Sequence, residues 1–168
     1  KNNERIKVLF IGRPIKIKGK HIIKQCEKLT SQWQVKEIRS KYQKADLSFF
    51  LEQPKDIIYE YIENAEYEDL PKYYQMADVL VVPSLYNEGF SRVVIEGASC
   101  GCAVITSNKG ALPEMVSPFG KVIEPTPENF AKELVKLEHN REALQKIQTN
   151  TALYALKNFN IKNAEVFL

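Results

Sequence analysis

The sequence predicts one doubly wound, Rossmann-like α/β domain over residues 1–168, with a parallel sheet of about six strands and helices on both faces. Short apolar runs alternate along the chain with longer segments whose apolar residues recur every three or four positions. Polar turns that contain glycine follow two of the apolar runs. The 168 residues suffice for one domain with a core, and no internal repeat or low-complexity linker divides them.

The expected strands are short and mostly apolar. In chain order they are Ile6–Ile11, Trp33–Arg39, Ile57–Ile62, Val79–Val82, Ala103–Thr106 and Lys121–Ile123. The second of these runs alternates between apolar and polar residues, as a half-exposed strand does. Residues 40–55 have no clear pattern, and within them Leu47–Leu51 is compatible with a strand or with part of a helix.

The expected helices lie between and after these strands. They cover about Lys18–Leu29, Glu68–Met76, a segment that begins near Ser91, Pro127–His139 and about Arg141–Asn158. In the first, Ile22, Cys26 and Leu29 share one face because they are four and three residues apart. Pro71 falls in the first turn of the second helix, where proline is tolerated.

The composition is that of a soluble globular protein, with 44% hydrophobic and 27% charged residues. A net charge of +3 on scattered lysines does not favour a nucleic-acid partner. No apolar run approaches the ~20 residues that cross a bilayer, and no secretory signal is visible. The three cysteines lack metal-ligand spacing, so we expect reduced packing residues, as suits the cytosol.

The most informative segment is residues 83–105, PSLYNEGFSRVVIEGASCGCAVI. A polar turn with Glu88 follows the apolar run Val79–Val82, and a helix that starts near Ser91 carries Glu96. The unpaired N–H groups at a helix start attract phosphate. Carboxylates before and inside the helix can bind hydroxyls on either side of that phosphate. The segment therefore predicts a site for a nucleotide sugar.

The same segment resembles the donor-binding motif of the family-4 retaining glycosyltransferases, which have the two-domain GT-B architecture. The matching residues are Pro83, Ser84, Glu88, Gly89, Phe90, Glu96, Ala98, Gly101, Val104 and Ile105. Seven residues separate the two glutamates, as in that family. Ser91 stands where the family usually has glycine, and Ala103 stands where it usually has proline. The resemblance runs with gaps from about Ile6 to Pro125.

This resemblance implies the C-terminal, donor-binding half of a GT-B enzyme. Glu88 would contact the transferred sugar, and Glu96 would hold the ribose hydroxyls. The sugar or the diphosphate would meet backbone N–H groups at the helix start, those of Gly89, Phe90, Ser91 and Arg92. Ser91 is in addition a residue type that caps helices well.

A second group of candidates follows the first strand, in the segment GRPIKIKGK of residues 12–20. Fixed cations stabilise the negative charge that develops on a diphosphate leaving group. The resemblance places Arg13 and Lys18 on the diphosphate, while Lys16 and Lys20 keep the choice of lysine open. None of the four aspartates forms a D-x-D motif, so we expect neither a metal nor another cofactor.

One piece of the family pattern is missing, because no glycine-rich turn occurs near Ile38–Lys44. The turn near Tyr61–Glu63 is then the candidate for contacting the base, with no preference among uracil, guanine and adenine. The aromatic cluster Tyr59, Tyr61, Tyr67, Tyr73 and Tyr74 reads as core and rim rather than as a stacking site for the base.

The resemblance, together with the absence of a D-x-D motif, implies a cytoplasmic, metal-independent hexosyltransferase domain that serves the synthesis of a surface glycan or glycolipid. Its partners would be a nucleotide-sugar donor and a sugar or lipid-linked acceptor, the latter bound by an absent N-terminal domain. A peripheral contact of the longer protein with the cytosolic membrane face is compatible with such an acceptor. We expect the domain alone to transfer nothing. A non-catalytic GT-B-like binding module and a nucleotide-sugar epimerase remain alternatives.

Overall fold

The computed structural model describes residues 5–13, 15–41, 57–62 and 67–159. Within these ranges the centre is a five-stranded sheet in the order β2-β1-β3-β4-β5, and all neighbouring strands are parallel. The strands are β1 (Ile6–Ile11), β2 (Ile57–Ile62), β3 (Val79–Val82), β4 (Ala103–Ser107) and β5 (Lys121–Ile123). Five of the six expected strands are thus confirmed.

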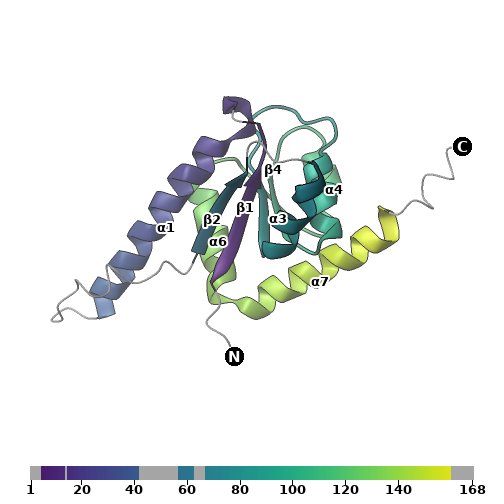
Figure 1. Ribbon diagram of the computed structural model, residues 1–168. Coiled ribbons are helices and arrows are strands. Elements are labelled where there is room, and N and C mark those ends of the chain that lie inside the picture. Colours follow the sequence, from purple (N-terminus) through teal and green to yellow (C-terminus); the bar gives the residue numbers. More distant parts are fainter. Residues whose placement is uncertain (1–4, 14, 42–56, 63–66, 160–168) are drawn as a thin grey trace, which may run out of the picture.

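Helices cover both faces of the sheet (Figure 1). The helical elements are η1 (Lys16–Lys18), α1 (Lys20–Lys41), η2 (Tyr67–Asp69), α3 (Leu70–Met76), α4 (Arg92–Ser99), α5 (Leu112–Val116), α6 (Pro127–His139) and α7 (Arg141–Asn158). On one face, Val8 and Phe10 of β1 pack in a core with residues of α1 and α6. On the other face, Leu9 joins residues of α3, α4, α5 and α7, because successive strand residues point to opposite faces.

The remaining expected strand, Trp33–Arg39, is wrong because these residues belong to α1. The chain has no glycine or proline between Gly19 and Pro54, so nothing in the sequence ends the helix at Leu29. Trp33 also lies four residues after Leu29, a helical spacing that the alternating pattern concealed. The unassigned stretch Leu47–Leu51 lies outside the described residues.

The second half of the chain agrees more closely with the sequence. The predicted bounds of α6 and α7 are those observed, and each helix begins with a side-chain cap. The Thr126 hydroxyl accepts a hydrogen bond from the backbone N–H of Asn129 at 3.2 Å, and the Asn140 side chain accepts one from Ala143 at 2.9 Å. The five-residue helix α5 was not expected, because so short a segment has too few turns for a helical period.

The strand order defines where a ligand is expected to bind. The chain passes from β1 to β2 on one side and then returns to β3 on the other side of β1. In open parallel sheets, ligands bind beyond the carboxyl ends of the strands at the place where this direction reverses. The loops after β1 and β3 meet there, and they carry the cationic and acidic candidates.

Candidate functional site

The loop after β1 is held tightly against the loop after β3. Gly19 has a left-handed φ of 78°, and a Cβ at this position would overlap the carbonyl oxygen of Pro83. The Leu85 N–H donates a hydrogen bond of 2.8 Å to the Ile17 carbonyl. Glycine is required at position 19 both by the backbone conformation and by the lack of space. This contact sets the position of Lys18 relative to Glu88.

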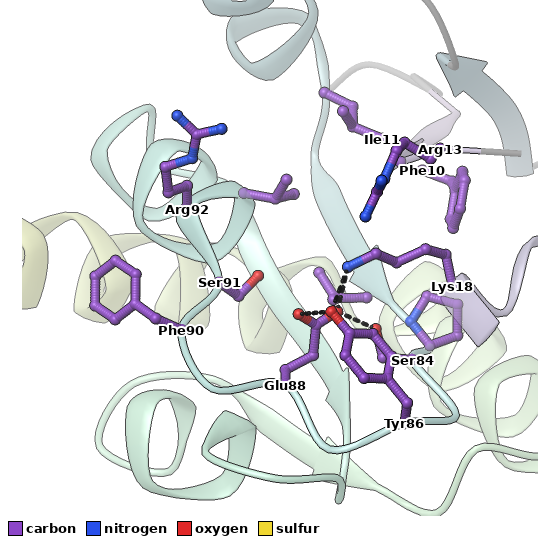
Figure 2. A pocket seen from close by; sticks show the side chains of 14 residues that line it. Phe10, Ile11, Arg13, Lys18, Ser84, Tyr86, Glu88, Phe90, Ser91 and Arg92 are labelled. Atoms are coloured by element: carbon purple, nitrogen blue, oxygen red, sulfur yellow. Dashed lines mark hydrogen bonds and ion pairs between the residues drawn. The ribbon is translucent and has the colours of Figure 1, made fainter. Parts of the chain in front are cut away.

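A cavity of about 420 Å³ opens between these two loops and the start of α4 (Figure 2). Its lining residues are Phe10, Ile11, Gly12, Arg13, Lys18, Val82, Pro83, Ser84, Tyr86, Glu88, Phe90, Ser91, Arg92 and Val93. The structure therefore brings both expected cations together with four further candidate site residues, Glu88, Phe90, Ser91 and Arg92. Phe90, 65% exposed, lies with Arg92 across the cavity from Lys18.

Glu88 is the centre of the polar contacts in this cavity. Only 6% of the residue is exposed, and three donors compensate its burial. Its Oε1 accepts hydrogen bonds from the Lys18 ammonium and the Ser84 hydroxyl, both at 2.6 Å. Its Oε2 accepts one from the Tyr86 hydroxyl at 2.8 Å. These contacts fix the orientation of the carboxylate.

Lys18 connects Glu88 to Tyr86. Its Nζ donates to the Tyr86 hydroxyl at 3.0 Å and lies 4.8 Å from the centre of the Tyr86 ring. Burial by itself lowers the pKa of Lys18, but the hydrogen bonds to Glu88 and Tyr86 outweigh it and leave the pKa raised. Burial by itself raises the pKa of Glu88, but the hydrogen bonds from Lys18, Ser84 and Tyr86 outweigh it and leave the pKa below its usual value. Both groups are charged at neutral pH.

The loop after β4 supports Glu88 from below. Gly110 has a left-handed φ of 58°, and a Cβ there would overlap the backbone nitrogen and oxygen of Glu88. The Ala111 N–H donates a 2.7 Å hydrogen bond to the Glu88 carbonyl. Sequence reasoning missed this support. The only signal was a glycine in the polar stretch after β4.

Glu96 lies in a different cavity. This second cavity has a volume of about 480 Å³ and lies between α3 and α4. Its lining residues are Glu68, Leu70, Pro71, Tyr74, Ile95, Glu96, Ser99 and Cys100. The Tyr74 hydroxyl donates a 2.7 Å hydrogen bond to Glu96 Oε2. Glu88 and Glu96 are thus not brought into one cavity, and Gly89 lines neither of the two.

Ser91 precedes the first residue of α4, as expected for a cap position, but its side chain makes no capping hydrogen bond with the described residues. Its φ is −107° and its ψ is 100°, an extended conformation that any residue adopts. Serine in place of the family's glycine therefore does not strain the backbone. The residue is buried and lines the first cavity.

The remaining sequence expectations concern cysteines and aromatic residues. Cys26 and Cys102 are buried, which raises the pKa of each to about 12, and Cys100 is half-buried; none forms a disulfide. Tyr74 is a core residue with 1% exposure, in agreement with the prediction. The expected base-contacting turn extends to Glu63, which lies outside the described residues. No helix in the described part of the chain is long and apolar enough to cross a bilayer.

The sheet order and the polar cavity at its reversal point define a Rossmann-like domain of the kind found in two-domain GT-B proteins. Comparison with known sequences is more specific. The profile of the family described as "Glycosyl transferases group 1" matches residues 1–153. The chain therefore belongs to the group 1 glycosyltransferase family.

Three curated relatives are similar to parts of this chain. Spore coat protein SA of Bacillus subtilis is 28% identical over 169 aligned positions, which cover 90% of this chain and 44% of that protein. O-antigen chain mannosyltransferase B of Escherichia coli is 34% identical over 57% of this chain and 25% of its own length. D-inositol 3-phosphate glycosyltransferase of Streptomyces bingchenggensis is 35% identical over 52% of this chain and 20% of its own length. The chain spans less than half of each relative.

Solved structures agree on the fold. Sucrose-phosphate synthase from Thermosynechococcus elongatus superimposes with a TM-score of 0.71 at 20% identity, over 99% of this chain and 45% of that one. The C-terminal domain of a group 1 glycosyltransferase, LpcC of Francisella tularensis, gives a TM-score of 0.70 at 23% identity, over 94% of this chain and 88% of that one. Anabaena HepE in complex with UDP gives a TM-score of 0.69 at 19% identity, over 97% of this chain and 48% of that one. The expected Rossmann-like fold of a GT-B domain is confirmed.

Proposed function

We propose that this chain is the donor-binding domain of a retaining, metal-independent glycosyltransferase that transfers a hexosyl group from a nucleotide-diphosphate sugar. The acceptor would be a sugar or a lipid-linked sugar, and the product a surface glycan or glycolipid made in the cytoplasm at the membrane face. The observation that carries the proposal is the charged pair of Lys18 and Glu88 beside the start of α4, at the reversal point of the sheet.

The cationic side of the cavity supports binding of a diphosphate. An ammonium group has three N–H donors, and the described contacts of Lys18 use two of them, on Glu88 and Tyr86. The third can bind a phosphate oxygen without breaking the pair. The Arg13 guanidinium extends into the same cavity (Figure 2). As the bond between sugar and diphosphate breaks, these cations would stabilise the developing negative charge.

The start of α4 would add donors that carry no formal charge. The first N–H groups of a helix have no partner within it, and here they stand at the cavity wall formed by Ser91, Arg92 and Val93. The amides from Gly89 to Arg92 keep the role that the sequence suggested. We propose that Arg13, Lys18 and these amides supply the stabilisation of the leaving group, so that no metal is needed.

The two carboxylates would recognise the two ends of the donor. A carboxylate has about four acceptor positions, and three donors occupy those of Glu88, which leaves room for one sugar hydroxyl. Glu96 would bind the ribose hydroxyls from the second cavity, whose walls include the apolar side chains of Leu70, Pro71 and Ile95. Such walls suit a nucleoside, whose base has apolar faces. Separate cavities for the glutamates are compatible with a ligand that reaches from sugar to nucleoside.

A calorimetric titration tests this function. The chain is titrated with UDP, GDP and ADP without divalent metal, and UDP comes first because the HepE neighbour binds UDP and UDP-glucose. We expect one nucleotide to bind and both Arg13→Ala and Glu96→Ala to weaken it. Lys132→Ala, an exposed charge on α6, is the control and should change nothing. Binding unaffected by both site variants would place the nucleotide elsewhere on the chain.

The rival function is a non-catalytic binding module that keeps the fold. The missing glycine-rich turn and the residues Ser91 and Ala103 are the departures that favour it. If the chain binds no nucleotide, the titration is repeated with the longer protein. Failure there as well would support the module and contradict the enzyme.

A further inference from the structure

Each candidate glutamate has one tyrosine as a hydrogen-bond donor. The Tyr86 hydroxyl donates to Glu88 Oε2 at 2.8 Å, and the Tyr74 hydroxyl donates to Glu96 Oε2 at 2.7 Å. The two pairs lie in separate cavities and come from different elements, the loop after β3 in one case and α3 with α4 in the other. Neither tyrosine was among the residues that the sequence motif pointed to.

The direction of the hydrogen bonds at Tyr86 follows from its neighbours. A lysine ammonium can only donate, so the Tyr86 oxygen accepts from Lys18 and its own proton goes to Glu88 (Figure 2). Lys18 and Ser84 hold Oε1, while Tyr86 is the donor that holds Oε2. The terminal torsion of a glutamate has a broad energy minimum. Without the phenol proton the carboxylate can turn about Oε1.

Tyr74 is fixed more rigidly. It is 1% exposed, and its backbone carbonyl accepts a hydrogen bond of 3.1 Å from the Cys102 thiol, next to β4. Burial first, and then the hydrogen bond to Glu96, raise the pKa of Tyr74, so its hydroxyl keeps the proton that it donates. No described residue bonds Glu96 Oε1. One oxygen is therefore held by the protein, and the other is left for ligand hydroxyls.

We propose that Tyr74 and Tyr86 are positioning residues, each of which holds one glutamate in the orientation that the hydroxyls of the donor require. Tyr86 acts through Glu88 on the sugar, and Tyr74 acts through Glu96 on the ribose. The inference rests on the proposed function, because it assigns a ligand hydroxyl to each glutamate. It predicts that each tyrosine governs a different part of the same ligand.

The test compares two affinity ratios, measured with the nucleotide that the calorimetric titration selects, UDP first. One ratio compares the ribonucleoside diphosphate with its 2′-deoxy form, and the other compares the glucose conjugate with the plain diphosphate. A hydrogen bond to a charged group corresponds to about a tenfold effect or more. Tyr74→Phe should lower the ribose ratio about tenfold and leave the sugar ratio unchanged. Tyr86→Phe should do the reverse, so each variant is the control for the other.

The outcomes separate the two levels of the proposal. If neither the unchanged chain nor the longer protein binds a nucleotide, the proposed function fails and the inference fails with it. If it binds but both variants weaken all ligands equally, or move neither ratio, the tyrosines are merely structural. A ratio of one in the unchanged chain overturns the role of the corresponding glutamate. Circular dichroism checks folding, and if Tyr74→Phe does not fold, the half-buried Tyr86 still decides its own half.

Discussion

At the scale of single residues, the site depends on a carboxylate that is buried and yet charged. Removing an ionised group from water is costly unless it is paired and hydrogen-bonded. Glu88 meets both conditions through Lys18, Ser84 and Tyr86. The partners are 70, 4 and 2 residues away in the chain. The charge of the site is thus linked to the docking of two distant loops.

The pH dependence of stability should reveal this pair. The pKa of Glu88 is lowered from its usual 4.5, so its contribution is present above 4.5 and is lost as the pH falls through the lower folded value. The pKa of Lys18 is raised from 10.5, so its contribution is present below 10.5 and is lost as the pH rises through the higher folded value. Between these limits the contribution is constant.

Urea unfolding of the chain and of Glu88→Gln measures this effect. At pH 7 the variant should be less stable by about 1–3 kcal/mol, and the difference should shrink below pH 4.5. Glu124→Gln, at an exposed position, is the control and should differ by less than about 0.5 kcal/mol at every pH. A difference that stays constant down to pH 3 would contradict the pairing.

At the scale of elements, the site is shaped by how closely loops approach one another. Gly110, in the loop between β4 and α5, touches the backbone of Glu88, and Gly19, just before α1, touches Pro83. Both have a left-handed φ. Glycine at the contact points lets the backbones of the loops after β1, β3 and β4 approach one another closely.

Replacing each of three glycines with alanine separates the cost of steric overlap from the cost of a left-handed backbone conformation. Gly101→Ala has open space around it but a left-handed φ of 80°, so it should cost about 1–2 kcal/mol. Gly110→Ala adds an overlap with the Glu88 backbone and should cost more and weaken nucleotide-sugar binding. Gly89→Ala has neither restriction and should be nearly neutral. Thermal unfolding ranks the three, and an equal loss at positions 101 and 110 would contradict the contact.

The helix caps offer a second comparison between elements. Thr126 caps α6 with its hydroxyl, whereas the Ser91 hydroxyl makes no capping hydrogen bond among the described residues. Thr126→Ala should therefore lower the free energy of unfolding by about 1 kcal/mol. Ser91→Ala should cost less than Thr126→Ala, because no capping hydrogen bond is lost. A large loss for Ser91→Ala would show that the hydroxyl caps α4 after all.

At the scale of the whole molecule, we propose that the chain is the second half of a two-domain enzyme. It covers 88% of an isolated C-terminal domain but only 45% of sucrose-phosphate synthase. The acceptor would bind to the other half in our proposal. We therefore expect the 168-residue chain to bind a nucleotide weakly and to transfer no sugar.

Incubation with UDP-, GDP- and ADP-hexoses and a range of sugar and lipid-linked acceptors tests this expectation. Products are detected by mass spectrometry, and the longer protein serves as the positive control. A glycosylated acceptor formed by the chain alone would contradict the need for a second domain. Catalytic release of nucleoside diphosphate without an acceptor would instead support the epimerase alternative.

Much of the fold was predictable because its signals are local. The strands are short apolar runs, the two last helices have clear periods, and their ends carry turn residues or caps. The placement of Arg13, Lys18 and Glu88 around one cavity was predictable, because two short segments carry them to the ends of β1 and β3, and parallel strands end at one edge. The path of α1 through Trp33–Arg39 was not, because a few residues can satisfy two periods at once.

The sequence by itself determined five strands of the sheet, the family motif and the residue types that can bind a diphosphate and hydroxyls. Only the tertiary structure decided which of those residues share a cavity, and it separated Glu96 from Glu88. It also supplied the tyrosines that hold the two glutamates and the glycine beneath Glu88. The physical reason is that a hydrogen bond depends on distance and angle in space, whereas a motif records only order along the chain.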